Sequence, residues 1–120
     1  MTVIKQDDLI QSIADALQFI SYYHPTDFIR AMRGAWEREE SPAAKAALTQ
    51  VLVNSRMCAI GKRPICQDTG IVNVLISVGM DVQWDADMAF EDMINEGVRR
   101  GYTHPDNVLR GSLLTDPNGA

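Results

Sequence analysis

Apolar residues in the first third of the chain recur at helical spacing and predict two helices. The first helix follows Asp7 and Asp8, whose negative charges suit the positive end of a helix. Its apolar stripe consists of Leu9, Ile10, Ile13, Leu17 and Ile20. The second helix begins within the sequence HPTDF, where Pro25 takes a tolerated early position, and it ends in the acidic run EREE.

A third helix is predicted from both its ends and its stripe. Ser41 is a favourable capping residue, and Pro42 behind it suits the first turn of a helix. Apolar and small residues then follow at alternating steps of four and three, up to and including Cys58. Gly61 and Pro64 are expected to end this helix.

The middle of the chain predicts a β-hairpin, and the remainder predicts further helix. The run 71–78, IVNVLISV, is short, β-branched and bounded by glycines, as a buried strand would be, and GMDVQW then offers a turn and a return strand ending near Trp84. Asp85 is expected to cap a helix that Gly101 closes, and the sequence from 102 onward begins like another helix. The predicted fold class is therefore mainly α with a small β-hairpin and four to five helices.

Composition limits the classes of function. A chain of 120 residues can bury one core, and its 46% hydrophobic and 22% charged content is ordinary for a globular protein. With 11 basic and 16 acidic residues, the net charge of −5 gives no overall positive field to attract nucleic acid or an anionic membrane. No apolar run has membrane-spanning length, and the N-terminus lacks the features of a signal peptide. We therefore expect a cytoplasmic protein that binds neither nucleic acid nor a membrane.

The two cysteines have different surroundings. Cys58 falls on the apolar stripe of the third helix, which indicates a small core residue. Cys66 lies in a stiff, polar turn, where a structural role and a chemical one are both open. The spacing of the two cysteines matches no short zinc pair, and a catalytic pair with His24 or His104 is a minor alternative because both histidines look like helix caps.

The tripeptide Asp68-Thr69-Gly70 permits a rival interpretation. Asp-Thr-Gly is also the signature of aspartic proteases, in which two carboxylates share a proton in an all-β fold. Here the preceding residues are ICQ and the first sixty residues are strongly helical, which argues against a protease. An Asp-Thr-Gly turn also forms readily without any ligand.

A longer string is more specific than the tripeptide. NSRMCAIGKRPICQDTGIVNV resembles the N-terminal region of class I fumarate hydratases, the iron-sulfur fumarases, and of the related L-tartrate dehydratase α subunits. The later NVLRGS resembles an N-L-R-x-S element of the same family. The resemblance covers essentially the whole chain, and family members continue for hundreds of residues. It implies that residues 1–120 are the N-terminal part of an iron-sulfur hydro-lyase domain.

The resemblance also implies roles for individual residues. Cys66 matches the first cysteine ligand of a [4Fe-4S] cluster, and Gln67 and Asp68 match residues that hydrogen-bond a dicarboxylic acid. Arg110 matches an arginine that binds a substrate carboxylate. The other cluster cysteines and the catalytic base lie beyond this chain in the family. We therefore expect no catalytic residue here, no activity of the chain alone, and a cluster that is present in the complete enzyme but absent from this fragment.

The reaction implied is the reversible hydration of fumarate to L-malate. The expected partners are a small dicarboxylate and the remainder of the enzyme or a partner subunit, with a homo-oligomer when the enzyme is complete. Two alternatives stay open: a dehydratase of the same family that acts on L-tartrate or another hydroxy acid, and a non-catalytic helical interaction module.

Overall fold

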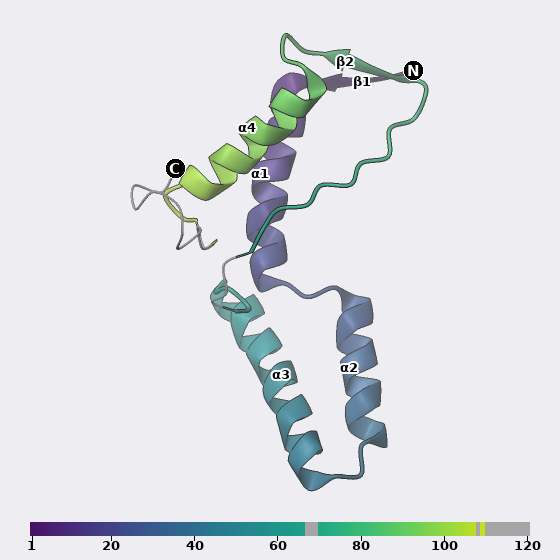
Figure 1. Cartoon of the computed structure of the whole chain (residues 1–120), viewed down its shortest axis with the longest axis vertical. Helices are drawn as coiled ribbons and strands as arrows, with labels where there is room; N and C mark the ends of the chain where they lie inside the picture. The colour runs from purple at the N-terminus through teal and green to yellow at the C-terminus, as the bar shows by residue number, and fades with distance from the viewer. Residues whose placement is uncertain (67–69, 108, 110–120) are drawn as a thin grey trace. The chain divides into compact units, whose positions relative to one another are not determined.

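The computed structural model describes residues 1–66, 70–107 and 109, and within these it contains four helices and two short strands (Figure 1). In chain order the elements are β1 (Thr2–Lys5), α1 (Gln6–Tyr22), α2 (Thr26–Arg38), α3 (Pro42–Gly61), β2 (Val82–Asp85) and α4 (Phe90–Thr103). Two compact units can be separated, one with Met1–Gln18 and the described residues after Cys66, the other with Phe19–Cys66. Among the described helices, none combines the length and hydrophobicity needed to span a bilayer. The prediction of a mainly helical chain with a small sheet is confirmed.

In the unit Phe19–Cys66, α2 and α3 form an antiparallel helical pair (Figure 1). Near the end of α2, the indole Nε1 of Trp36 donates a hydrogen bond of 2.9 Å to Oγ1 of Thr49. The ammonium of Lys45 lies 4.1 Å from the centre of the Trp36 ring, a cation–π contact. At the other end of the pair, Nδ1 of His24 and Oγ of Ser55 are 2.9 Å apart. Polar contacts at both ends thus set how the two helices align.

The limits of α3 are those predicted from sequence. Oγ of Ser41 accepts a hydrogen bond of 3.4 Å from the backbone N–H of Ala44, as a capping serine does. At the other end, Lys62 follows Gly61 in the left-handed conformation, with φ 49° and ψ 51°, and donates its N–H to the carbonyl of Cys58. The helix therefore ends in a tight reversal that starts the turn toward Cys66.

In the other unit, α1 and α4 approach closely because α4 carries glycines where they meet. A Cβ atom added at Gly97 would lie 2.7 Å from Cβ of Ile13 and 2.9 Å from the carbonyl oxygen of Ile10. One added at Gly101 would lie 3.1 Å from Cδ1 of Leu17. Buried apolar side chains of this unit are Ile10, Ala14, Leu17 and Met93. Its core is thus the contact between α1 and α4.

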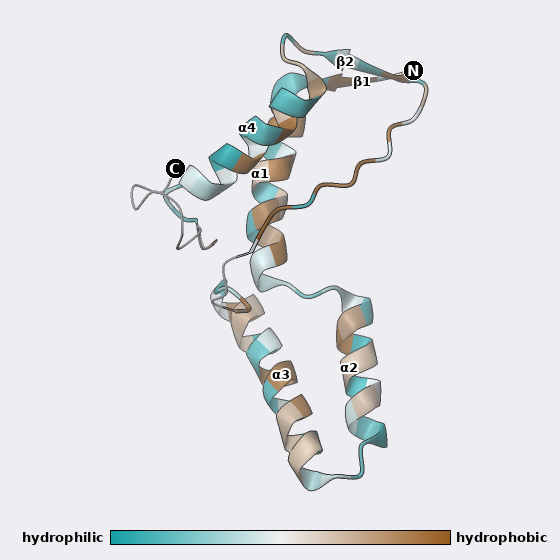
Figure 2. Ribbon diagram, in the orientation of Figure 1, coloured by the Kyte–Doolittle hydropathy of each residue, from teal (hydrophilic) through white to brown (hydrophobic). Residues whose placement is uncertain are grey.

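The predicted hairpin is wrong. The return strand exists as β2, but it pairs in parallel with β1, with Thr2 opposite Val82 and Lys5 opposite Asp85. The run 71–78 forms no ladder with any described residue. Extended apolar residues make a strand only when another strand supplies hydrogen bonds, and the partner of β2 is the N-terminal segment. Figure 2 shows the run 71–78 as a mainly hydrophobic stretch of chain.

The start of α4 also differs from the prediction. Asp85 is the last residue of β2, and the helix begins only at Phe90. Oε1 of Gln6 accepts hydrogen bonds from the backbone N–H groups of Asp87 and Met88, at 2.9 and 3.0 Å. These bonds hold the loop between β2 and α4 against the first residue of α1, so the loop takes residues that pattern alone assigns to the helix.

The helix α4 continues to Thr103, two residues past Gly101. His104 is its C-terminal cap residue and accepts, at Nδ1, a hydrogen bond of 3.0 Å from the N–H of Asp106. The described residues 104–107 form a turn and not the beginning of the predicted fifth helix. Leu109 is not helical either, and the rest of that predicted helix lies outside the described residues.

Candidate functional site

Cys66 is the one predicted site residue that the structure describes. Gln67, Asp68 and Arg110 lie outside the described residues, so their roles stay predictions. The thiol of Cys66 is free and exposed, whereas that of Cys58 is free and buried. Cys66 is thus the thiol that a cofactor or a substrate can reach.

The segment that leads to Cys66 is held by hydrogen bonds on both sides of Ile65. The N–H of Ile65 donates to the carbonyl of Ser21, at the end of α1, over 2.8 Å. Its carbonyl accepts a hydrogen bond of 3.0 Å from the side-chain amide Nδ2 of Asn54, on α3. Pro64 in front of it has a fixed φ. Both peptide groups of Ile65 are therefore anchored to helices directly before Cys66.

The side chain of Cys58 contacts the same segment from α3. Its side chain is 5% exposed, as expected for a small core residue. The thiol Sγ lies 3.4 Å from the carbonyl oxygen of Pro64 and 3.6 Å from Oδ1 of Asn54, and its single S–H, a weak hydrogen-bond donor, can serve one of these two acceptors at a time. Asn54 and Cys58 share one face of α3 because they are four residues apart. Sequence reasoning overlooked Asn54, although this spacing within NSRMC was visible.

His24 is engaged in packing. It does not cap α2, whose N-terminal cap residue is Pro25. Its Nδ1 bonds to Ser55, and its ring stacks on that of Phe28 with 4.3 Å between centroids and 17° between planes. No cluster of three or more His, Cys, Asp or Glu side chains able to hold a metal ion occurs in the described part of the chain. A metal site here would need ligands beyond these residues.

A second segment that leads to a predicted site residue is held by Asn107. Its Oδ1 accepts a hydrogen bond of 2.8 Å from the N–H of Leu109, and its Nδ2 donates to the carbonyls of Leu109 and Tyr102, at 3.1 and 2.9 Å. The amide of Gln18 donates to Oδ1 of Asn107 over 2.9 Å. The backbone directly before Arg110 is therefore shaped by one asparagine. Sequence reasoning missed both Asn107 and Gln18.

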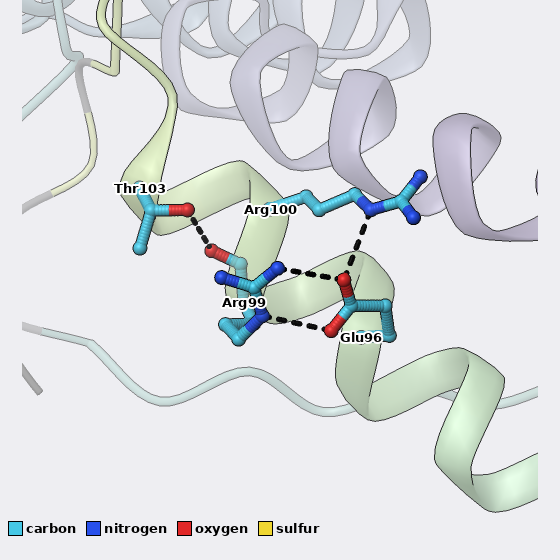
Figure 3. A network of polar contacts seen from close by, with 4 residues as sticks. All are labelled: Glu96, Arg99, Arg100 and Thr103. Carbon is cyan, nitrogen blue, oxygen red and sulfur yellow. Dashed lines mark hydrogen bonds and ion pairs between the residues drawn. The ribbon is translucent and has the colours of Figure 1, made fainter.

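The charged network on α4 is a local one (Figure 3). The carboxylate of Glu96 accepts two hydrogen bonds of 2.7 Å from Arg99 and one of 3.0 Å from Arg100. Hydrogen bonds from Arg99 and then from Arg100 lower the pKa of Glu96 from 4.5 to about 2, and the pKa of Arg99 is raised by the same pairing. Glu96 is thus held as an anion and is unsuited to serve as a general base.

Comparison with known proteins assigns the family. Residues 10–119 match the model of the family described as "Fumarate hydratase (Fumerase)". The chain belongs to the fumarate hydratase family. The predicted resemblance is therefore confirmed over nearly the whole chain.

The chain is also similar to the "Putative L(+)-tartrate dehydratase subunit alpha" of Methanocaldococcus jannaschii. It is 26% identical over 88 residues, which make up 73% of this chain and 31% of the relative. The chain thus spans about a third of that relative's length. No solved structure matches the chain.

The donor chemistry of Cys66 fits part of an iron-sulfur site. Cluster ligation uses cysteine thiolates that the iron can reach. The thiol of Cys66 meets this requirement because it is exposed and free, whereas Cys58 is buried against Pro64 and Asn54. Of the described residues, Cys66 alone offers an exposed thiol of this kind.

Proposed function

We propose that this chain supplies one cluster ligand and part of the dicarboxylate site of an iron-sulfur hydro-lyase that interconverts fumarate and L-malate. The observation that carries the proposal is the presentation of Cys66, a free and exposed thiol at the end of a segment anchored on both sides of Ile65. Free cysteines with a structural role are most often buried, as Cys58 is. Family membership supports the same conclusion.

The residues would divide the work as follows. Cys66 would hold the cluster through its thiolate, and the cluster when bound would supply Lewis-acid chemistry. Gln67 and Asp68, the next two residues, hydrogen-bond the dicarboxylic acid. Arg110 would bind one of its carboxylates, as a planar guanidinium can do with two parallel hydrogen bonds. The base that takes the proton lies outside this chain, so the chain alone is inactive.

The rest of the active enzyme would come from further chain or from a partner subunit. The chain covers 31% of a relative that is itself named as a subunit. Several large apolar side chains before β2 are exposed, including Ile71 at 86%, Leu75 at 98% and Met80 at 103%. Such side chains suit a segment that packs against other parts of an enzyme. A cytoplasmic location is part of the proposal, because reducing compartments keep thiols such as Cys66 free.

L-tartrate dehydration is the second candidate reaction. It is favoured by one observation, the similarity to a tartrate dehydratase subunit alpha. Both reactions eliminate water from a dicarboxylic hydroxy acid, so the residues above would serve either one. Parallel assays with fumarate, L-malate and L-tartrate distinguish the two.

The test is anaerobic reconstitution of the complete enzyme with iron and sulfide, followed by its visible spectrum, its iron content and these assays. We expect Cys66→Ser to abolish both cluster content and turnover while the far-UV circular dichroism stays unchanged. Cys58→Ser is the matched control and is expected to retain the cluster. Loss of the cluster in Cys58→Ser but not in Cys66→Ser would reverse the assignment. Absence of any cluster in the wild-type complete enzyme would refute the proposed function and favour a non-catalytic interaction module.

A further inference from the structure

We propose that Asn54 is a positioning residue for Cys66: its side-chain amide fixes the peptide group that immediately precedes the cysteine. This inference rests on the proposed function, in which the sulfur of Cys66 must lie where a cluster can bind. It adds a residue on α3 to the functional apparatus, outside the PICQDTG string that the sequence indicates.

The hydrogen bond of Asn54 acts on the peptide group that joins Ile65 to Cys66. Nδ2 donates to the carbonyl of Ile65 over 3.0 Å, and this carbonyl belongs to the same planar peptide group as the N–H of Cys66. The neighbouring N–H of Ile65 is held by Ser21 at 2.8 Å. With both its peptide groups fixed, Ile65 loses most of its freedom to rotate. The direction in which the chain enters Cys66 is therefore set by the helices.

The orientation of the Asn54 amide is itself determined. The carbonyl of Ile65 can only accept a hydrogen bond, so the NH₂ group of Asn54 is the end that meets it, and Oδ1 then lies 3.6 Å from Sγ of Cys58. Cys58 also lies 3.4 Å from the carbonyl of Pro64. Two successive carbonyls, those of Pro64 and Ile65, thus find donors on one face of α3. An aspartate at position 54 has the same shape but no donor, and it would place a carboxylate oxygen against a carbonyl oxygen.

Two measurements on the complete enzyme separate positioning from general stability. Hydrogen exchange of the peptide that contains Ile65 reports how firmly the segment is held. The rate at which a chelator removes iron from the reconstituted enzyme reports how well Cys66 is presented to the cluster. Asn54→Ala removes the amide, and Asn54→Asp removes the donor with the shape kept. Gln50→Ala, one turn earlier on α3 and also an exposed amide, is the matched control.

We expect both Asn54 variants to raise the exchange rate and the iron-loss rate by roughly two- to tenfold, the change that corresponds to one hydrogen bond. Gln50→Ala should match the wild type in both. Wild-type values for either rate in the Asn54 variants, or equal effects in Gln50→Ala, would overturn the positioning role. If the wild type takes up no cluster, the proposed function fails, and the exchange rates alone decide whether Asn54 anchors the segment.

Discussion

Replacement of Gly97 by alanine tests the close contact between α1 and α4. The new methyl group would lie 2.7 Å from Cβ of Ile13 and 2.9 Å from the carbonyl oxygen of Ile10. Neither atom can turn away, because one is backbone and the other is attached directly to it. Gly34 in α2 is the matched control, since a methyl group there would meet only the flexible guanidinium of Arg38, at 3.0 Å from Nη1.

Two opposing effects decide whether each glycine-to-alanine substitution raises or lowers the free energy of unfolding. Alanine is more favourable than glycine within a helix by about 1 kcal/mol. Overpacking costs about 1–3 kcal/mol, and Gly97 belongs near the upper limit because carbon atoms prefer separations of about 3.5–4.0 Å. The free energy of unfolding should therefore fall by about 2 kcal/mol in Gly97→Ala. In Gly34→Ala it should rise by up to about 1 kcal/mol, because Arg38 can move aside.

Each of the two compact units contains one tryptophan, which gives each variant its own probe. Trp84 of β2 reports on the unit with α1 and α4, and Trp36 reports on α2 and α3. Urea titrations followed by fluorescence, in variants that keep one tryptophan, yield the two free energies. A Gly97→Ala variant as stable as the wild type, or shifts of both variants in the same direction, would refute a steric clash at Gly97.

Two further predictions concern Glu96 and Cys58. Because the folded-state pKa of Glu96 is lowered from 4.5 to about 2, its ion pairs contribute stability at pH values above 4.5 that is lost as the pH falls toward 2. Glu96→Gln should be less stable than the wild type at pH 7 and equal to it near pH 2, as measured by urea unfolding across that range; a constant difference would contradict this. Cys58→Ser should lower the free energy of unfolding by about 1 kcal/mol, because burying a hydroxyl costs more than burying a thiol and a hydrogen bond to the Pro64 carbonyl or to Oδ1 of Asn54 offsets only part of that cost. Unchanged stability would show that the site accepts the hydroxyl without cost.

Local signals were sufficient for much of the helical structure. Ser41 and Pro42 start α3 as expected, and Gly61 ends it, because capping and chain reversal depend on neighbouring residues alone. The same holds for Cys58, whose place on the apolar stripe predicted its burial. The string PICQDTG likewise indicated the family that residues 10–119 match.

Strand pairing did not follow from such signals. β1 covers Thr2–Lys5, too short to stand out in the sequence, and its partner β2 begins at Val82. Pairing between segments so far apart depends on how α1 and α4 pack, which no local pattern records. The run 71–78 had the composition of a strand, yet in the described structure it pairs with no other segment.

The candidate site, too, was predictable from the sequence only in part. The sequence by itself determined that Cys66 occupies a turn after a helix and within a family motif, because glycine, proline and motif residues act over a few positions. Only the tertiary structure decided what holds that turn: the carbonyl of Ser21 and the amide of Asn54 reach Ile65 from two different helices. Hydrogen bonds between residues 11 and 44 positions apart form only after the helices have packed, so they leave no periodic trace in the sequence.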